Sequence, residues 1–423
     1  MKWPTVELGN ICSVVTKGTT PRTLGREYVP EGIPFLRAEN LLGEEVILGP
    51  STLYIDHTTN QLLARSIIKP DDVLISIAGT IGRCAVVPRN MPEMNCNQAV
   101  AIVRISGPLN CRFFLHWLKT SDAQSQMSGA KVTQTISNLS LHQIKKLVVP
   151  LPSTSEQHRI SEILDQADTL RKKRDVADDK INRMLIAIFY NMFGDPATNP
   201  MGWKIGQMGD IILDTRNGLY KPAKYYGTGV GILKMFNIQN GDLNLSRIDL
   251  IDVTESEFDA YKLISGDILI NRVNTPELVG KCAVITDDIG QAVFESKNIR
   301  MRVDSERVTP EYVTAYLNCP FGHSSLRRGV KHAIGMATIN NTDLRKTSIP
   351  LPPIEIQHQW SKVLNDLKLL KKSALKTKEN IASLYQSLLF KAFAGKLTAK
   401  WREANMKELI AEMELQAKAL EGN

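Results

Sequence analysis

The chain reads Pro-Leu-Pro-Ser-Thr-Ser-Glu-Gln-His over residues 150–158 and Pro-Leu-Pro-Pro-Ile-Glu-Ile-Gln-His over residues 350–358. Earlier positions recur at the same offset of 200 residues, as Trp3 does in Trp203. A repeat this long lies outside the range of short solenoid and propeller repeats, so each copy can be a domain with its own core. The sequence therefore predicts a duplicated protein whose two similar, non-identical copies have two similar, non-identical targets.

Composition sets the broad class of the protein. With 423 residues and 43% hydrophobic content, the chain is long enough for more than one packed core. Its 52 Lys and Arg against 44 Asp and Glu give a net charge of +8, which favours a polyanionic partner without identifying one. Because it shows neither a membrane-spanning apolar run nor a signal peptide, we expect a soluble, cytoplasmic protein. The six cysteines and seven histidines have no metal-site spacing, so we predict neither disulfides nor a metal.

Each copy begins with a segment of mixed character. Short β-branched or apolar runs, broken by glycine, proline and asparagine, recur in both copies at 72–77, 99–103, 267–270 and 298–303. One shorter helical stretch follows in each, at 113–118 and 312–317. This pattern predicts two α+β domains, each with a curved and mostly antiparallel sheet.

After each Pro-Leu-Pro the apolar period changes from two to three and four. Apolar residues then hold the a and d positions of a heptad for four heptads. The predicted seam residues are Ile160, Ile163, Leu170, Ile181 and Ile188 in the first helix and Val363, Leu367, Leu370, Ile381, Leu384 and Leu388 in the second. A strict seam is narrower than the stripe of a helix that only covers a core, so we expect these helices to pack on each other.

The resulting fold prediction is α+β. Two similar globular domains are joined by two long helices that form an antiparallel coiled coil, with internal pseudo-twofold symmetry. The predicted parts are a first globular domain at 1–150, a first long helix at 151–195, a second globular domain at 196–350, a second long helix at 351–400 and a C-terminal amphipathic helix at 401–423.

The chain lacks the residue patterns that a stand-alone enzyme needs. It has no Gly-x-x-x-x-Gly-Lys-[Ser/Thr] loop to hold a triphosphate. An enzyme that modifies a flipped adenine would polarise the amino group with Asn or Asp and prolines and stack a ring on the base. Asp195-Pro196 and Asn199-Pro200 lack the second proline and the ring. We therefore predict no catalytic residue and favour a binding function.

One basic loop precedes the final predicted strand of each copy. Lys131 and Lys331 occupy matching positions in these loops, each two residues after a glycine. A single basic loop is usually a solvated surface, but its recurrence favours phosphate contact. Arg, Lys, Asn and Gln are also the side chains that read guanine and adenine edges. The predicted nucleic-acid contacts are Lys17, Arg22, Arg37, Asn40, Lys131 and Gln134 in the first copy and Arg216, Lys221, Asn237, Arg272, Asn274, Arg327, Arg328 and Lys331 in the second.

The whole pattern resembles the specificity subunit of a type I restriction-modification system. The resemblance covers residues 1 to about 400, and the motifs are specific in combination. They are 149–152 with 156–160, 349–352 with 357–358, Met-Phe-Gly-Asp-Pro at 192–196 and Ala-Phe-Ala-Gly-Lys-Leu-Thr at 392–398.

The resemblance implies a sequence-specific DNA-binding subunit that is not itself an enzyme. Two target recognition domains would each read one half of a split DNA sequence, with paired helices fixing the gap between the halves. Differences between the loops at 16–26 and 215–226 predict an asymmetric target. The resemblance also implies docking of two methyltransferase subunits, joined by restriction and translocase subunits. S-adenosylmethionine, ATP and magnesium would belong to those partners, and this chain would hold no cofactor.

Two other functional classes stay open on the sequence. A single-chain DNA-modifying enzyme with a divergent active site would methylate or cut DNA by itself when given those cofactors. A coiled-coil scaffold that binds only proteins would not be retained on DNA at moderate salt, with or without methyltransferase partners.

The matched lysines yield a first prediction. Lys131→Ala and Lys331→Ala should weaken binding of the assembled complex to all DNA sequences, because phosphate contacts carry no sequence information. Each lost contact should also flatten the dependence of log affinity on log salt by about one unit. Binding titrations over a range of salt concentrations measure both effects. An unchanged salt dependence in both variants would contradict a phosphate-binding role.

Overall fold

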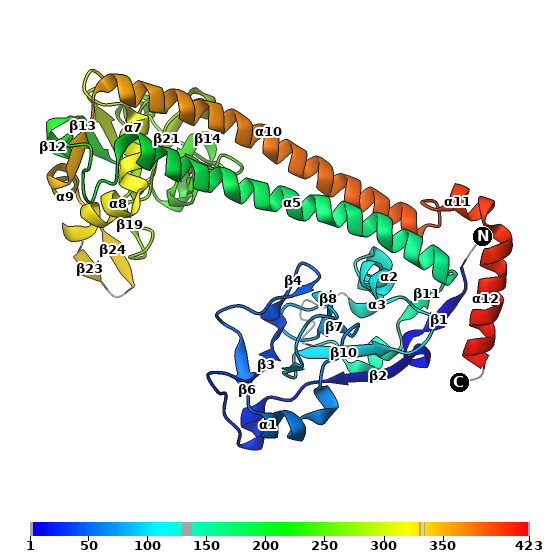
Figure 1. Cartoon of the computed structure of the whole chain (residues 1–423). Coiled ribbons are helices and arrows are strands. Elements are labelled where there is room, and N and C mark those ends of the chain that lie inside the picture. The colour runs from blue at the N-terminus through cyan, green and yellow to red at the C-terminus, as the bar shows by residue number, and fades with distance from the viewer. Residues whose placement is uncertain (1–2, 129–137, 240, 330, 334, 422–423) are drawn as a thin grey trace. The chain divides into compact units, whose positions relative to one another are not determined.

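The computed structural model describes residues 3–128, 138–239, 241–329, 331–333 and 335–421, drawn as ribbon in Figure 1. The chain divides into two units, Met1–Arg174 with Thr377–Asn423, and Asp175–Lys376. Each unit holds one globular lobe and parts of both long helices. We call residues 3–152 the first lobe and residues 203–352 the second lobe. Each long helix thus contributes residues to both units.

A four-stranded antiparallel sheet forms the centre of the first lobe. Its order is β2 (Cys12–Lys17), β10 (Val100–Ile105), β7 (Val73–Ser76) and β8 (Cys84–Val86). Alternate residues of β7 enter different cores, as the period of two requires. Val73 and Ile75 pack in one cluster with helix α2 (Cys111–Trp117), whereas Leu74 packs in another with Leu36. The sheet is therefore covered on both faces.

The second lobe repeats this arrangement. Its central sheet has the order β13 (Ile212–Asn217), β22 (Asn298–Val303), β18 (Ile268–Asn271) and β20 (Cys282–Val284). Ile268 and Ile270 face a core shared with helix α7 (Pro310–Asn318), while Leu269 faces a second core. The predicted α+β class and the predicted duplication are both confirmed.

A three-stranded sheet lies beside the central sheet in each lobe. The first is β6 (Leu53–Ile55), β3 (Ile33–Leu36) and β9 (Asn95–Cys96), and the second is β17 (Asp249–Ile251), β14 (Tyr226–Leu233) and β21 (Ala292–Phe294). In both sheets one pair is parallel, β3 with β9 and β14 with β21. A matching short hairpin follows in each lobe, β4 (Leu41–Leu42) with β5 (Glu45–Val46) and β15 (Ile238–Gln239) with β16 (Asp242–Leu243).

Smaller elements complete the lobes. The first and last strands of each lobe pair with each other, β1 (Thr5–Glu7) with β11 (Val148–Pro150) and β12 (Lys204–Gln207) with β25 (Ser348–Leu351). The second lobe also has a small sheet of β19 (Val273–Asn274), β24 (Met336–Thr338) and β23 (Lys331–Ala333). The remaining helices of the lobes are α1 (His57–Leu62), α3 (Ser121–Ser128), α4 (Leu141–Lys145), α6 (Glu255–Tyr261), α8 (Pro320–Leu326) and α9 (Asn341–Lys346).

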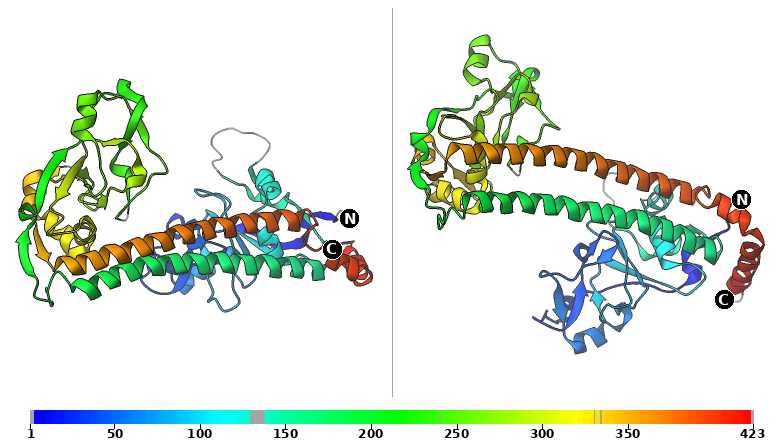
Figure 2. Two further views of the ribbon diagram at one scale, coloured as in Figure 1. Left: turned by 90° about the horizontal axis from the view of Figure 1, so that it is seen from above. Right: turned by 45° about the horizontal axis from the view of Figure 1, so that its top comes forward.

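Two helices of 40 residues follow the lobes, α5 (Thr154–Phe193) and α10 (Ile354–Phe393). In the first unit, the Arg171 guanidinium of α5 lies 5.2 Å from the centre of the Tyr385 ring of α10. In the second unit, the rings of Phe189 and Trp360 are 5.4 Å apart. Since the early part of each helix meets the late part of the other, the two helices run antiparallel within each unit (Figures 1 and 2). The predicted antiparallel pairing is confirmed.

The predicted seam residues are only partly right. Of them, Ile160 is fully buried, and seven others are partly buried: Ile163, Ile181, Ile188, Val363, Leu367, Ile381 and Leu388. Three more have about half of their surface exposed, namely Leu170 at 53%, Leu370 at 51% and Leu384 at 51%. The strict a/d assignment was therefore wrong at Leu170, Leu370 and Leu384.

The most buried residues lie one position later in several turns. Leu164, Phe189, Tyr385 and Leu389 are at most 4% exposed, next to the predicted Ile163, Ile188, Leu384 and Leu388. These side chains join cores that also contain residues of a lobe. A helix that packs on both a helix and a lobe needs a wider and displaced apolar stripe. The expectation that the helices pack mainly on each other was thus incomplete.

An aromatic pair is repeated where each lobe meets the end of a long helix. Phe113 of α2 lies 5.1 Å from Phe393 of α10, and Tyr312 of α7 lies 4.7 Å from Phe193 of α5, between ring centres. Each lobe therefore packs against the last turns of the long helix that follows the other lobe. Neither long helix is an extension of one lobe alone.

The C-terminal segment belongs to the first unit and covers the start of α5. It forms α11 (Ala399–Ala404) and α12 (Met406–Glu421). Glu412 accepts a hydrogen bond from the Ser155 amide at 3.0 Å, and Gln416 donates to the Thr154 hydroxyl at 2.9 Å. A carboxylate at a helix N-terminus satisfies free amides and is favoured by the helix dipole. No helix in the described ranges is long and apolar enough to cross a lipid bilayer.

A buried glutamine explains the Pro-Leu-Pro motif. Gln157 accepts from the Asn110 amide at 2.7 Å and donates to the carbonyls of Pro108 and Pro152 at 3.0 and 2.9 Å. Its side chain therefore joins the loop before α2, the Pro-Leu-Pro turn and the first turn of α5.

Gln357 makes the same three bonds in the second lobe. It accepts from the Thr309 amide at 2.9 Å and donates to the carbonyls of Arg307 and Pro352 at 3.2 and 2.8 Å. Both glutamines are fully buried. The repeated motif thus fixes the start of each long helix to the lobe before it.

Gln157→Ala and Gln357→Ala should each lower the free energy of unfolding by about 1–3 kcal/mol, because buried backbone groups lose their partners. The exposed Gln359 on α10 is the control, and its change to alanine should alter stability by less than about 0.5 kcal/mol. Urea unfolding measures all three. Equal effects of Gln357→Ala and Gln359→Ala would contradict the proposed role of the buried amide.

Candidate nucleic-acid interface

In both lobes, three loops meet at one end of the central sheet. In the second lobe they follow β13, follow β18 and precede β22, because Asn217 pairs with Ile299 and Asn271 with Asn298. We call residues 217–222, 271–276 and 295–298 the sheet-end loops of the second lobe. Their counterparts in the first lobe are residues 17–22, 76–80 and 96–99. Loops at a sheet end leave side chains free for binding while the strands hold them in place.

A glycine is required at the closest approach of two of these loops. A Cβ atom on Gly18 would lie 1.8 Å from the Cys96 carbonyl oxygen, and one on Gly218 would lie 2.1 Å from the Glu295 carbonyl oxygen. Any other residue would push the two backbones apart. This packing constraint accounts for the recurrence of the glycine after Lys17 and Asn217.

The predicted residues Lys17 and Arg22 lie on the sheet-end loops of the first lobe. Both are exposed. Arg22 sits in a short 3-10 turn (Pro21–Leu24) and pairs with Glu27 at 3.1 Å, with both side chains about two-thirds or more exposed. A pair this exposed costs little to break, so Arg22 remains available to a polyanion.

In the second lobe Arg216 lies in β13 just before the matching loop, and Lys221 lies on that loop. Arg216 is exposed and lies 5.6 Å from the centre of the Tyr261 ring. Lys221 is largely covered, pairing with Glu257 at 2.6 Å and donating to the Asp252 carbonyl at 2.8 Å. Its charge is satisfied within the lobe, which makes Arg216 the better candidate for DNA contact.

The predicted Asn40 and Asn237 occupy equivalent structural positions. Each is buried and accepts from the main-chain amide three residues earlier, at 2.8 Å. Asn40 also donates to the Ile47 carbonyl, and Asn237 to two carbonyls of its hairpin. Contact with a base edge would require these bonds to break. Both asparagines therefore shape the hairpins β4–β5 and β15–β16, and we leave them out of the interface.

The predicted Arg37 lies at the start of the same turn in the first lobe. Its guanidinium pairs with Glu39 and donates to the Ser51 carbonyl at 3.2 Å. Arg37 is half-buried. Like Asn40, it is engaged within the lobe.

The predicted residues of the second basic loop gather around the small sheet. Lys331 of β23 pairs with Thr338 of β24, which pairs with Val273 of β19. Arg327 and Arg328 lead into β23, and Arg272 immediately precedes β19. Residues that lie 55 positions apart in the sequence (272 and 327) are thus brought to one sheet. The side chain of Lys331 and the whole loop with Lys131 and Gln134 lie outside the described residues.

Asn274 is held inside this region. It is 7% exposed and donates to the side chain of Asn271 at 2.7 Å, and its own oxygen accepts from the Thr275 amide at 2.8 Å. Asn271 in turn donates to the Lys297 carbonyl at 3.0 Å. Asn274 therefore positions the loop that carries Arg272.

Sequence reasoning missed Lys297, which is exposed on the sheet-end loop beside Arg272. The Arg272 amide donates to the Lys297 carbonyl at 2.8 Å. Aligning the two copies strand by strand places Lys297 opposite Ala99 of the first lobe. Comparing the two copies could have identified Lys297 from the sequence. The alignment needs the strand register, however, and only the structure supplies it.

Basic residues on the long helices contact the hairpins of the lobes. In the first unit Lys172 pairs with Glu45 at 2.5 Å, and in the second unit Lys368 pairs with Asp242 at 3.2 Å. Glu45 and Asp242 lie on the matching hairpins β4–β5 and β15–β16. These two lysines therefore serve in part to fix the angle between helix and lobe.

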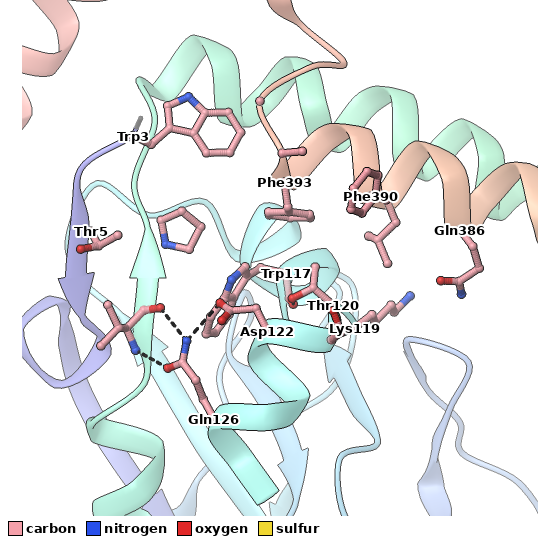
Figure 3. A pocket seen from close by; sticks show the side chains of 16 residues that line it. Trp3, Thr5, Trp117, Lys119, Thr120, Asp122, Gln126, Gln386, Phe390 and Phe393 are labelled. Carbon is pink, nitrogen blue, oxygen red and sulfur yellow. Dashed lines mark hydrogen bonds between the residues drawn. The ribbon is translucent and has the colours of Figure 1, made fainter. Parts of the chain in front are cut away.

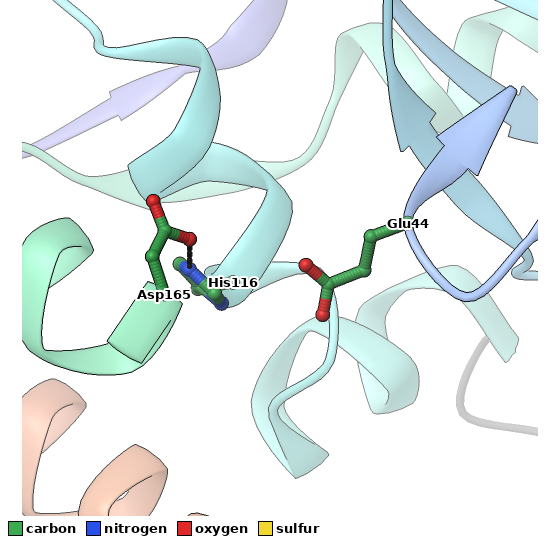
Figure 4. Close-up of side chains that lie close together, drawn as sticks. All are labelled: Glu44, His116 and Asp165. Atoms are coloured by element: carbon green, nitrogen blue, oxygen red, sulfur yellow. Dashed lines mark hydrogen bonds and ion pairs between the residues drawn. The ribbon is translucent and has the colours of Figure 1, made fainter. Parts of the chain in front are cut away.

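One cluster of metal-binding residue types lies in the first unit (Figure 4). The ligand atoms of Glu44, His116 and Asp165 lie within 4.8 Å of one another, and the His116 Nε2 is 2.7 Å from an Asp165 oxygen. The carboxylates of this cluster already have cationic partners, because Lys119 contacts Glu44 and Arg112 contacts Asp165. A metal ion would have to displace both. The cluster is better described as an ion-pair network that joins β4–β5, α2 and α5.

A groove of about 920 Å³ lies in the first unit between β1, the α2–α3 junction and the end of α10 (Figure 3). Trp3, Trp117, Phe390 and Phe393 supply much of its lining. Lys119 and Asp122 add opposite charges. Its apolar lining suits protein or peptide better than a nucleic-acid backbone.

Comparison with known proteins decides the family. A family model described as "Type I restriction modification DNA specificity domain" matches residues 1–176 and again residues 200–382. The chain belongs to this family. Each match spans one lobe and much of the long helix after it, so the duplication of the fold is also a duplication of the family domain. The chain is thus a DNA-binding specificity subunit and not a catalytic one, as the resemblance implied.

Relatives match nearly the whole chain. The type I restriction enzyme StySPI specificity subunit of Salmonella potsdam is 24% identical over 95% of this chain and 91% of its own. The EcoKI specificity subunit of Escherichia coli K12 is 23% identical with the same coverage of both chains. The fold is similar to the type I restriction-modification S subunit of M. genitalium, with a TM-score of 0.52 at 14% identity over 93% of this chain and 96% of that chain. A chain from a structure on complex assembly and conformational transition of the type I R-M system gives 0.56 at 18% identity, over 94% and 98%.

The ion-pair network yields a pH prediction. Burial raises the pKa of Asp165, but hydrogen bonds from His116 and Arg112 outweigh burial and lower this pKa to about 2. A carboxylate with a depressed folded pKa stabilises the protein above its unfolded pKa of about 3.9, and this contribution is lost as pH falls through the folded value. Because Asp165 is about one-third exposed, solvent screening reduces the expected contribution to about 1 kcal/mol.

Asp165→Asn should therefore lower the free energy of unfolding near neutral pH, and its difference from the wild type should shrink between about pH 4 and pH 2. Glu162→Gln on the same helix, whose pair with Arg159 is exposed, is the control and should have little effect. Urea unfolding at several pH values measures both. A difference for Asp165→Asn that stays constant with pH would contradict the assigned role.

Proposed function

We propose that this subunit reads an asymmetric, bipartite DNA target, with each lobe contacting one half of it. The proposal is carried by one observation: the two lobes present the same sheet-end loops on the same backbone scaffold, with different side chains. Matching backbones predict the same mode of docking on DNA. Different side chains predict different bases, because sequence is read by hydrogen bonds to base edges.

The long helices support a second part of the proposal, the docking of two methyltransferase subunits. Large apolar side chains on both helices are about half exposed or more: Leu170, Val176, Met184, Ile186, Leu369, Leu370, Leu375, Leu384 and Phe390. Large apolar side chains that a folded chain leaves exposed in number are typical of protein interaction sites. In the first unit Phe390, 69% exposed, also borders the groove of Figure 3. The displaced seam is thus explained if partner subunits cover the residues that the two helices leave open.

Restriction and translocase subunits would join the complex through the methyltransferases. S-adenosylmethionine, ATP and magnesium would then bind to those partners, and this chain would contribute no cofactor site. We place the complex in the cytoplasm, together with the DNA that it would read. Purified chain that methylates or cuts DNA without partners would instead favour a single-chain enzyme, and a chain that binds partners but never DNA would favour a scaffold.

Exchanging residues 201–348 for the equivalent lobe of a relative should change one half of the methylated sequence and leave the other half unchanged. The reason is that each lobe has its own sheet-end loops and one core made of its own residues alone. Mapping methylated adenines in cells that carry the complete system measures the result. The reciprocal exchange of residues 1–148 is the matched control and should change only the other half. Simultaneous change of both halves in either chimera would contradict the two-lobe model.

A further inference from the structure

We propose that Arg272 and Lys297 form a DNA contact specific to the second lobe, in which Arg272 reads a guanine in the major groove and Lys297 binds a neighbouring phosphate. The inference rests on the proposed function and identifies a residue pair that makes the two half-sites different. Neither residue has a charged equivalent in the first lobe, where Ile77 and Ala99 take their places.

The backbone around these positions is the same in both lobes. The Arg272 amide donates to the Lys297 carbonyl at 2.8 Å, and the Ile77 amide donates to the Ala99 carbonyl at 2.8 Å. On the other side, the carbonyls of Arg272 and Ile77 each accept from a main-chain amide at 2.9 Å. The two lobes thus differ at these positions in side chains and not in scaffold.

Arg272 carries a charge that no described residue of the lobe neutralises. Its Nε is buried, and among the described residues its guanidinium has no hydrogen bond and no ion pair. Two arginines of the adjacent central sheet are paired, Arg300 with Asp214 at 2.9 Å and Arg302 with Asp267 at 2.7 Å. Arg216 of β13, like Arg272, has no ion pair among the described residues. A guanidinium stays charged at any physiological pH, and a partly buried charge without a partner is costly. An acceptor supplied from outside the chain would remove that cost.

The side chain projects from a loop that is already fixed. Asn271 bonds the Lys297 carbonyl and the Asn298 side chain, at 3.0 and 3.2 Å, and Asn274 bonds Asn271. All three asparagines are buried. A fixed loop loses little conformational freedom on binding, which favours selective recognition.

Arginine and lysine side chains suit different groups on DNA. Arginine donates two parallel hydrogen bonds to O6 and N7 of guanine, the commonest specific contact in the major groove. Lysine is a point charge that suits a phosphate. Lys297 is exposed, and among the described residues it too has no ion pair. Arg327 and Arg328, in the 3-10 turn before β23, add positive charge next to the small sheet.

The first lobe cannot make this contact. Ile77 is 3% exposed and packs in the core, and Ala99 has no polar side chain. The half-site of the first lobe must therefore be read by other residues, such as Lys17 and Arg22 on their own loops. Lys297 adds a phosphate contact that the first lobe lacks. The affinity for the second half-site is therefore expected to fall more steeply with salt concentration than the affinity for the first.

The test replaces Arg272 and Lys297 with residues that cannot make the proposed contacts, including the isoleucine and alanine of the first lobe. Arg272→Ile, Arg272→Lys and Lys297→Ala are made in the full chain, assembled with its methyltransferase subunits. Bound duplexes are selected from a pool in which the first half-site is fixed and the second is randomised. Lys346→Ala is the matched control, because Lys346 is exposed on α9, which packs against the turn before β13 at the opposite end of the central sheet.

Wild-type complex should select a guanine at one position of the second half-site. Arg272→Ile should reduce that preference by about 10- to 100-fold, and Arg272→Lys should also lose it while keeping the salt dependence, because lysine lacks the paired donors. Lys297→Ala should weaken binding to all selected sequences and lower the salt slope by about one unit. The control should match the wild type.

Three outcomes would overturn the proposal. Unchanged selection by both Arg272 variants would remove Arg272 from base reading, and uniform weakening by Arg272→Ile would make it a phosphate contact. An unchanged salt slope in Lys297→Ala would remove the phosphate role. In each case a selective wild-type complex leaves the proposed function standing. If the wild-type complex selects no sequence at all, the proposed function itself fails.

Discussion

A buried glutamine at the first turn of each long helix is the contact on which the rest of the structure depends. Gln157 and Gln357 each satisfy one amide and two carbonyls of the loop and turn beside them. Unpaired backbone groups in these places would be costly to bury. The bonds therefore set where each helix starts and the direction in which it leaves its lobe.

That direction makes the core of each unit a shared one. Phe193 and Phe393, at the ends of the helices, each pack on the lobe that the helix does not follow. A lobe, the start of one helix and the end of the other thus stabilise one another within each unit. Such a shared core explains why the buried stripes on α5 and α10 are broader than a coiled-coil seam and displaced from it. Large apolar residues nevertheless remain exposed on both helices.

At the proposed binding surface the backbone is constrained, whereas the side chains are not. Gly18 and Gly218 are required for the close approach of two backbones, so this part of the scaffold is the same in both lobes. The side chains presented by the scaffold are free to differ, as Arg272 and Ile77 do. The duplicated fold thus has two sheet ends with the same backbone arrangement and different side chains, as the proposed reading of two different half-sites requires.

The repeat offset, the α+β class and the antiparallel helix pair follow from the sequence alone, because periodicity and the Pro-Leu-Pro motif are local and occur twice. The sequence also selects Arg272, on a sheet-end loop, and Arg216, in the strand that leads into another such loop. Tertiary structure alone decided that Asn40 and Asn237 cap turns, that Lys221 is neutralised by Glu257, and that Lys297 lies beside Arg272. Whether a polar side chain faces a partner or its own backbone depends on residues far away in the chain, and residue type does not record those contacts.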